Sequence, residues 1–464
     1  MGLTCHEIGI PSLTFHGPNK MDQVFQPYDH FIEGIKVEGR SFKEGTFSDS
    51  VMQVDCIPFD KSTGTSSTKK IKCENHNYDD SSYLYICKLK NKPGELIIKK
   101  CIQLKVPPGP LLGKLKAGEN VTLPDGRIIM SNDVVGPEEK GKIFIVMECP
   151  SVDYIDNLIG INELQQFFVN ENQQYDLLSL IVHFTPAEIV NDKRYQEWIS
   201  KFNPNVKHIL CNRDNSSFSS PSIDRLQTKL NLLDSKIFPL IYNFKSTNTS
   251  TDSNIINAPT LFKYNLRPIH NFGVDPESIG EPDYETHKNE AFSQFGFSES
   301  LNIYQNGVLT LANQSNNSQM NYPEIVFLGT GSAIPNKTRN TSAVLVDIDE
   351  NTCFLMDCAE NTIGQIFRFY GEEFENQLKK IKAIYISHLH ADHHLGLLGL
   401  IKNRSLITSE KIDLIIPPVV NKWIQHYNTN VEPISHLYNI IPCFWFADSK
   451  GDQQKIEELL NKFH

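Results

Sequence analysis

Eight consecutive residues, 387–394, carry four histidines and an aspartate in the order Ser-His-Leu-His-Ala-Asp-His-His. They follow the apolar run 381–386 and precede an apolar stretch interrupted by glycine, 395–401. This pattern predicts a strand, a tight loop and then a helix. So many metal-capable side chains at the end of a strand are typical of a hydrolytic metal loop.

Four side chains of this run have the spacing of metal ligands. Alternate residues at a strand end point the same way, so His388 and His390 can converge on one ion while Asp392 and His393 turn toward a second. The alternative is a histidine-rich loop in which Asp392 is an ordinary helix N-cap. The density of ligands favours two adjacent metals.

Two upstream segments narrow the interpretation. Residues 327–335 read Phe-Leu-Gly-Thr-Gly-Ser-Ala-Ile-Pro and continue through the loop 335–340, Pro-Asn-Lys-Thr-Arg-Asn. Residues 354–365 read Phe-Leu-Met-Asp-Cys-Ala-Glu-Asn-Thr-Ile-Gly-Gln. Together with the histidine run, they resemble the motifs of ribonuclease Z, the tRNA 3′-processing endonucleases of the metallo-β-lactamase superfamily.

Two residues depart from the motifs of that family. Ala359 and Asn361 stand where the family has glycine. Glycine commonly marks backbone with positive φ or close approach by another group. Asn tolerates the left-handed conformation and Ala does not, so we expect local reshaping beside the metal loop.

The resemblance implies an α/β metallo-β-lactamase fold, the four-layer αββα sandwich, in the two-lobed long form of the enzyme. We expect a degenerate amino half with a possible tRNA-binding arm at 1–290, a linker at 291–322 and an incomplete catalytic half at 323–464. His183 stands alone at a strand end, where a structural role is expected. Tyr195, Trp198 and Phe202 have helical spacing that is typical of a core.

The net charge of −11 argues against a general nucleic-acid coat, so RNA binding would need a local basic patch. One candidate is the lysine-rich segment 99–118. Composition alone favours a solvated loop there. The resemblance instead implies that the neighbouring region forms an arm that grips the tRNA. Possible RNA-binding residues are Lys114, Lys116, Lys337 and Arg339.

The resemblance also assigns roles within the site. Two Zn²⁺ ions per catalytic site are expected, with His388 and His390 on one and with Asp392 and His393 on the other. Asp392 is the expected catalytic residue, as proton acceptor for the attacking water. Asp357 is expected to orient a ligating histidine, whereas His394 lies either behind the ligands or simply in the packing.

The number of ligands is a difficulty, because a catalytic zinc normally takes three protein ligands and this run supplies two per metal. In the family, the further ligands come from downstream motifs. The histidines that follow the run, His426, His436 and His464, lie outside such contexts. We therefore expect the printed chain to cover the middle of a long-form enzyme, shortened at both ends.

Three functions follow. The first is a zinc-dependent endoribonuclease that removes the 3′ trailer from precursor tRNA. The second is a shortened, inactive pseudoenzyme that binds RNA or a partner. The third is a hydrolase of the same fold that acts on thioesters or lactams; the loop 335–340 and the long amino half argue against it.

Composition sets broader limits. The chain has 464 residues, 39% of them hydrophobic, which is enough for two cores. No apolar stretch has the length of a membrane span, and the first ten residues lack the features of a signal or transit peptide. With ten scattered cysteines, reduced thiols and an intracellular location are expected, with the nucleus or cytoplasm favoured and a mitochondrial location left open. The oligomeric state stays open.

Overall fold

A computed structural model describes residues 9–17, 21, 35–41, 46–62, 81–169, 177–246, 253–278, 280–312 and 322–443, apart from the side chains of 308–312. The chain divides into two compact units. Unit 1 comprises Met1–Ser41, Ser217–Lys245 and Gly280–His464, and unit 2 comprises Phe42–Ser216 and Ser246–Ile279. Within the described ranges, no helix has the length and apolar character needed to cross a membrane.

Unit 2 is built on a seven-stranded sheet in the order β11-β10-β9-β8-β5-β4-β3. The pairs from β3 to β8 are antiparallel, and those from β8 to β11 are parallel. The strands are β3 (Thr46–Ser48), β4 (Met52–Phe59), β5 (Ser82–Leu89), β8 (Ile143–Met147), β9 (Leu178–His183), β10 (Lys207–Leu210) and β11 (Ile255–Asn257). A two-stranded ribbon, β12 (Tyr264–Asn265) and β13 (Gly273–Val274), flanks the short helix η3 (Ile269–Asn271).

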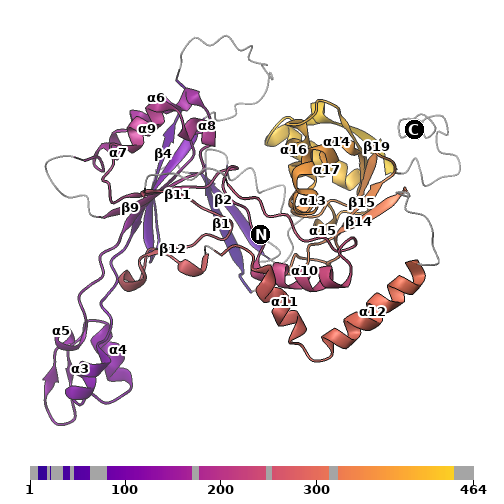
Figure 1. The fold of residues 1–464 in the computed structure, drawn as a ribbon. Coiled ribbons are helices and arrows are strands. Elements are labelled where there is room, and N and C mark those ends of the chain that lie inside the picture. Colours follow the sequence, from indigo (N-terminus) through magenta and orange to yellow (C-terminus); the bar gives the residue numbers. More distant parts are fainter. Residues whose placement is uncertain are drawn as a thin grey trace. The chain divides into compact units, whose positions relative to one another are not determined.

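Short helices cover one face of this sheet (Figure 1). They are η2 (Val152–Tyr154), α6 (Ile155–Ile159), α7 (Asn162–Gln165), α8 (Ala187–Val190) and α9 (Lys193–Ile199). The Asp192 side chain caps α9 by accepting a hydrogen bond from the Arg194 N–H. Tyr195 and Trp198 are fully buried, and Phe202 is buried just beyond the helix end. The predicted core role of these three aromatic residues is confirmed.

An arm projects from unit 2 between β5 and β8 (Figure 1). Its elements are α3 (Ile98–Gln103), α4 (Pro110–Lys116), β6 (Val121–Thr122), β7 (Ile128–Ile129) and α5 (Ser131–Val134). Pro110 begins α4 at a position where its missing N–H costs no helical hydrogen bond. The arm has a small core of its own, which includes Cys101, Leu115 and Val134. It is therefore a separately packed lobe within unit 2.

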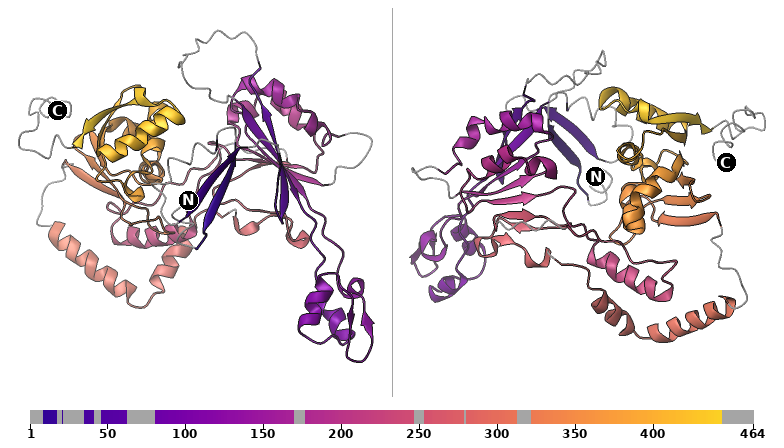
Figure 2. Two further views of the ribbon diagram at one scale, coloured as in Figure 1. Left: turned by 180° about the vertical axis from the view of Figure 1, so that it is seen from behind. Right: turned by 45° about the horizontal axis from the view of Figure 1, so that its top comes forward.

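Unit 1 contains a six-stranded sheet in the order β14-β15-β16-β17-β18-β19. The strands are β14 (Glu324–Gly329), β15 (Ala343–Asp347), β16 (Cys353–Met356), β17 (Ile381–Tyr385), β18 (Ile412–Ile416) and β19 (Tyr438–Pro442). Helices α13 (Thr362–Tyr370), α14 (Phe374–Lys380), α16 (Leu397–Ser405) and α17 (Pro418–Asn430) pack on one face, where the main core lies (Figure 2). On strands of the same sheet, Ile325, Phe327 and Met356 are exposed.

Elsewhere in the described part of unit 1 lie a parallel strand pair and three longer helices. The strands are β1 (Ser12–Gly17) and β2 (Lys36–Ser41), and the helices are α10 (Pro221–Leu233), α11 (Tyr284–Phe292) and α12 (Phe297–Ala312). The Tyr242 N–H donates a hydrogen bond to the Arg368 carbonyl, 2.8 Å away, so the segment after α10 packs against α13. Helix α12 lies within the predicted linker 291–322, and residues 313–321 fall outside the described ranges. The predicted division into halves stays a prediction.

The two large sheets have the same topology. Strands β4, β5, β8, β9, β10 and β11 repeat the order and directions of β14 to β19, with antiparallel pairs followed by parallel pairs. Both also carry a register shift at the start of their first parallel pair, at Ile143/Phe144 and at Cys353/Phe354. This register aligns His183 with Ile386 and His208 with Leu414.

His183 and His208 thus occupy positions that are apolar core in the other sheet. His183 Nδ1 lies 2.7 Å from the Tyr195 hydroxyl, and its Nε2 lies 3.0 Å from His208 Nδ1. The Thr185 hydroxyl lies 3.2 Å from the Tyr195 hydroxyl and accepts a hydrogen bond from the Cys149 N–H. The structural role expected for His183 agrees with this buried network. Burial, reinforced by neighbouring His208, holds the pKa of His183 well below its ordinary value.

This lowered pKa makes stability depend on pH. As the pH falls below the ordinary histidine value of 6.5, the unfolded chain takes up a proton that buried His183 does not. The free energy of unfolding therefore falls on the acid side, by up to about 1.4 kcal/mol per pH unit for one group. Replacing the pair by its apolar counterparts, His183→Ile with His208→Leu, should flatten this slope between pH 7.5 and 5, measured by urea unfolding. Equal slopes in the two proteins would contradict the assignment.

Candidate metal centre

The histidine loop lies at the carboxyl end of β17, in the parallel part of the six-stranded sheet. Ligands of open α/β sheets commonly bind at this edge. The chain leaves β17 at Tyr385, forms the short helix α15 (Ala391–His394) and enters α16. A Cβ at Gly396 would collide with the Ala359 carbonyl oxygen, so glycine is required where this turn crosses the neighbouring segment. The predicted order of strand, loop and helix is confirmed.

The structure brings the first predicted pair of ligands together. His388 Nε2 and His390 Nδ1 lie 2.9 Å apart, and the two ring centroids are 4.5 Å apart. Both side chains are exposed. Two nitrogen ligands of one tetrahedral zinc lie roughly 3.3 Å apart, from Zn–N distances of about 2.05 Å. The two nitrogen atoms therefore have a spacing that suits one ion.

The second predicted pair is also adjacent. His393 Nε2 lies 3.6 Å from Asp392 Oδ2, again close to the separation expected for two ligands of one zinc. Asp392 is not the N-cap of α15, because His390 holds that position. The Asp392 carboxylate instead accepts a hydrogen bond from the Ala333 N–H at 2.7 Å. The alternative interpretation of Asp392 as a helix cap is wrong.

The residues present fit zinc in their chemistry but supply two donors to each ion. Imidazole nitrogens and a carboxylate are ordinary zinc ligands. In the part of the chain that the structure describes, no three His, Cys, Asp or Glu side chains are grouped closely enough to hold an ion. The assignment of these residues to two pairs of ligands stays a prediction.

The Asp357 carboxylate is hydrogen-bonded to residues of the histidine loop. Its Oδ2 lies 2.6 Å from His393 Nδ1, and its Oδ1 accepts a hydrogen bond from the Ser387 N–H at 2.8 Å. The Ser387 hydroxyl lies 2.8 Å from the same Oδ1 and 2.9 Å from His388 Nδ1. The carboxylate is largely shielded, with 16% of its side chain exposed. Asp357 therefore occupies the place expected of a residue that orients a ligating histidine.

His394 and Cys358 belong to the packing behind the loop. His394 is buried, places its Nδ1 2.9 Å from the His390 carbonyl oxygen and meets the Trp423 ring edge-on. Burial lowers the pKa of His394, which favours its neutral ring. Burial raises the pKa of the Cys358 thiol to about 12, so this cysteine stays protonated. The sequence left two roles open for His394, behind the ligands or in the packing, and these contacts fit the packing role.

The loop 335–340 is tied to the site through its two ends. A Cβ at Gly329 would collide with the Thr341 carbonyl oxygen, which explains one glycine of the turn before the loop. The Asn336 side chain accepts hydrogen bonds from the backbone of Thr338 and Arg339 and closes the loop. At the last residue of the loop, the Asn340 side-chain amide donates to the Glu360 carbonyl at 2.9 Å. Lys337 and Arg339 are exposed on this fixed loop.

Three residues around the histidine loop have left-handed backbones. Ala333 has φ +62°, Asp357 +58° and Asn361 +59°. Such conformations cost energy in residues other than glycine and are common at functional sites. Ala359, in contrast, has no positive φ and is fully buried. The local reshaping expected beside the metal loop stays a prediction, whereas Asn361 does adopt the conformation for which Asn is suited.

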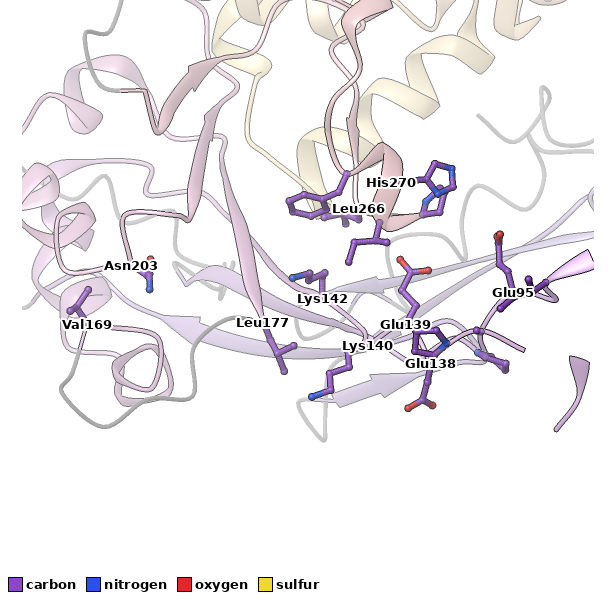
Figure 3. A pocket seen from close by; sticks show the side chains of 18 of the residues that line it. Glu95, Glu138, Glu139, Lys140, Lys142, Val169, Leu177, Asn203, Leu266 and His270 are labelled. Carbon is purple, nitrogen blue, oxygen red and sulfur yellow. The ribbon is translucent and has the colours of Figure 1, made fainter. Parts of the chain in front are cut away.

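The arm presents the other candidate residues. Lys114 and Lys116 lie in the last turn of α4, and both are exposed. A pocket of about 1170 Å³ lies in unit 2 at the base of the arm (Figure 3). Its lining mixes acidic residues such as Glu95 and Glu138 with basic residues such as Lys140. None of the candidate metal ligands lines it.

Sequence reasoning missed two groups that contact the site residues. One is the Ala333 N–H, which holds Asp392; a backbone donor leaves no trace in a pattern of side chains. The other is the Ser387 hydroxyl, which touches Asp357 and His388. Its position immediately before the first histidine was a usable signal, because histidine ligands usually need a hydrogen-bond partner on their second nitrogen.

Known proteins share sequence and fold with this chain. A family model described as "Anti-Pycsar protein Apyc1" matches residues 323–433. The chain is 31% identical over 491 residues to "Ribonuclease Z, mitochondrial" of Drosophila melanogaster, covering 98% of this chain and 61% of that protein. The long-form ribonuclease Z from yeast superimposes with a TM-score of 0.63 at 17% identity, covering 97% of this chain and 65% of that one. The chain belongs to the ribonuclease Z family.

The human "Zinc phosphodiesterase ELAC protein 2" is also similar, at 30% identity over 495 residues. This alignment covers 96% of the present chain and 59% of the human protein. The sequence predicted the ribonuclease Z family and the metallo-β-lactamase fold, and both predictions are confirmed. The chain spans about three-fifths of the length of these curated relatives.

The left-handed backbone at Asn361 gives a testable prediction. Asn361→Ala should lower the free energy of unfolding by roughly 1 kcal/mol, because Ala is strained at positive φ. Asn361→Gly should leave it within about 0.5 kcal/mol of the parent. Urea unfolding measures both, with Asn376→Ala in helix α14 as a control at an ordinary helical position. A larger loss for Gly than for Ala would show that the Asn361 side chain, not its backbone, matters.

Proposed function

We propose that this chain carries part of a zinc-dependent endoribonuclease that removes the 3′ trailer from precursor tRNA by phosphodiester hydrolysis. The observation that carries the proposal is the pairing of His388 with His390 and of Asp392 with His393, at the carboxyl edge of a sheet homologous to that of ribonuclease Z. The names of the relatives supply the zinc and the tRNA substrate.

Two zinc ions are proposed, one on each pair of ligands. When bound, zinc supplies a Lewis acid that neutralises charge on the phosphate and makes water acidic enough to react at neutral pH. The chain's own residues then have distinct tasks. The Asp392 carboxylate is the proposed acceptor of the proton from the attacking water, and the Ala333 N–H fixes its orientation. Asp357 orients the histidines.

RNA binding is proposed for the exposed basic residues. Lys337 and Arg339 lie on the loop that follows Ala333 in the sequence, and the Ala333 N–H contacts Asp392. Lys114 and Lys116 lie on the arm of the amino half. The proposed amino half, 1–290, is degenerate because its sheet repeats the catalytic topology while His183 faces the core and not a ligand pair. We also propose an intracellular location.

Cleavage of a labelled precursor tRNA with a 3′ trailer tests the function. The purified chain with added zinc should cut at the trailer junction. His388→Ala should lower the cleavage rate at least about 100-fold, because a proposed direct ligand of zinc is lost. His436→Ala, which changes an exposed histidine outside the site, is the matched control.

No cleavage by the chain, together with undiminished RNA binding in His388→Ala, would instead favour the inactive RNA-binding alternative. The shortage of described ligands is the observation that keeps this alternative in view. Cleavage that is equally fast in His388→Ala would contradict the assignment of the site.

The arm is tested by binding alone. Lys114→Ala with Lys116→Ala should weaken precursor tRNA binding and reduce the slope of log affinity against log salt by roughly 1 per lost phosphate contact. Lys193→Ala with Lys422→Ala removes the same charge from two other exposed helical positions and should change little. Filter binding over a range of salt concentrations measures the effect, and equal losses in both double variants would argue against a specific arm contact.

A further inference from the structure

The Ser387 hydroxyl lies between groups that serve different proposed metals. Its Oγ is 2.8 Å from Asp357 Oδ1, 3.0 Å from Asp357 Oδ2 and 2.9 Å from His388 Nδ1. It also lies 3.4 Å from His393 Nδ1. Ser387 is half-buried at the point where the chain leaves β17, so its side chain has few alternative partners in water.

When both histidines are neutral, one pattern of donors satisfies these contacts. The Asp357 carboxylate can only accept, so the single hydrogen of the Ser387 hydroxyl is donated to it. The hydroxyl oxygen then accepts from His388 Nδ1–H. His393 Nδ1–H donates directly to Asp357 Oδ2. In this pattern both histidines carry their proton on Nδ1 and keep a free lone pair on Nε2.

The Nε2 atoms are the ones that face the other candidate ligands. His388 Nε2 points to His390 Nδ1, and His393 Nε2 points to Asp392. A histidine that ligates through one nitrogen usually donates its other N–H to an oxygen, which fixes both the tautomer and the ring orientation. Asp357 reaches His393 directly, but it reaches His388 only through Ser387.

We propose that Ser387 is a positioning residue. Its hydroxyl acts as a hydrogen-bond relay that links the Asp357 carboxylate to His388, so that one carboxylate orients the histidines of both proposed metal positions. This inference rests on the proposed metal-dependent function and adds a residue to it. The Ser387 N–H also donates to Asp357, which anchors the backbone independently of the hydroxyl. Replacing the hydroxyl therefore removes the relay and leaves the backbone in place.

The tautomer of His388 tests the relay without metal or activity. In the metal-free chain labelled with ¹⁵N-histidine, NMR should show His388 protonated on Nδ1. Ser387→Ala should shift His388 toward a mixture of tautomers, and Ser387→Thr, which keeps the hydroxyl, should restore the Nδ1–H form. Ser405→Ala is the matched control, because this half-buried serine hydroxyl donates to the Lys402 carbonyl of its own helix, away from the histidine loop. An unchanged tautomer in Ser387→Ala would overturn the proposal.

Zinc affinity gives a second readout. In competition with a chelator, Ser387→Ala should bind the ion on the His388 and His390 pair about 10- to 100-fold more weakly, the usual effect of losing an outer hydrogen-bond partner. Ser387→Thr and Ser405→Ala should bind as the parent does. Equal zinc affinity in Ser387→Ala and the parent would overturn the relay.

These outcomes separate the relay from the proposed nuclease. If the parent binds zinc and the tautomers respond as expected but no RNA is cut, the relay stands and the nuclease proposal fails. If RNA is cut and Ser387→Ala changes neither tautomer nor zinc affinity, the nuclease stands and the relay fails. Circular dichroism of each variant confirms that the comparison is made between folded proteins.

Discussion

The Asp357 carboxylate holds the candidate site together. It lies at the end of β16, in a left-handed conformation, and accepts hydrogen bonds from the first residue of the histidine loop and from His393. A carboxylate that accepts several bonds in a shielded position is strongly fixed in orientation. The parallel pairing of β16 with β17 brings it under the loop, so the sheet itself sets the geometry of the histidines.

The two sheets show how one topology supports different roles. They share strand order, directions and the position of a register shift. In unit 1 the aligned core positions are Ile386 and Leu414, and the polar residues lie past the strand end. In unit 2 the polar residues His183 and His208 lie inside the core, where Tyr195 satisfies one of them. Polarity at a strand end can serve chemistry, whereas polarity within the core restricts packing.

Sequence reasoning reached the parts of the structure that leave periodic or clustered patterns. The strand before residue 387, the paired ligands and the core aromatics of α9 were all predicted. It did not foresee that the Ala333 N–H holds Asp392 or that Ala359 has no positive φ, because backbone torsions depend on contacts distant in sequence. The Ala333 N–H contact joins residues 59 positions apart, and no local pattern encodes it.

The arm has a consequence for how this architecture can change. Lys88 on β5 pairs with Ile143 on β8, and the Gly141 N–H is bound by the Asn91 side chain, so the arm leaves and re-enters the sheet at neighbouring points. Its lobe packs around its own core. A segment whose ends are adjacent and whose core is its own can be lengthened, shortened or replaced as a unit. After such a change, β5 and β8 would still pair in the same register.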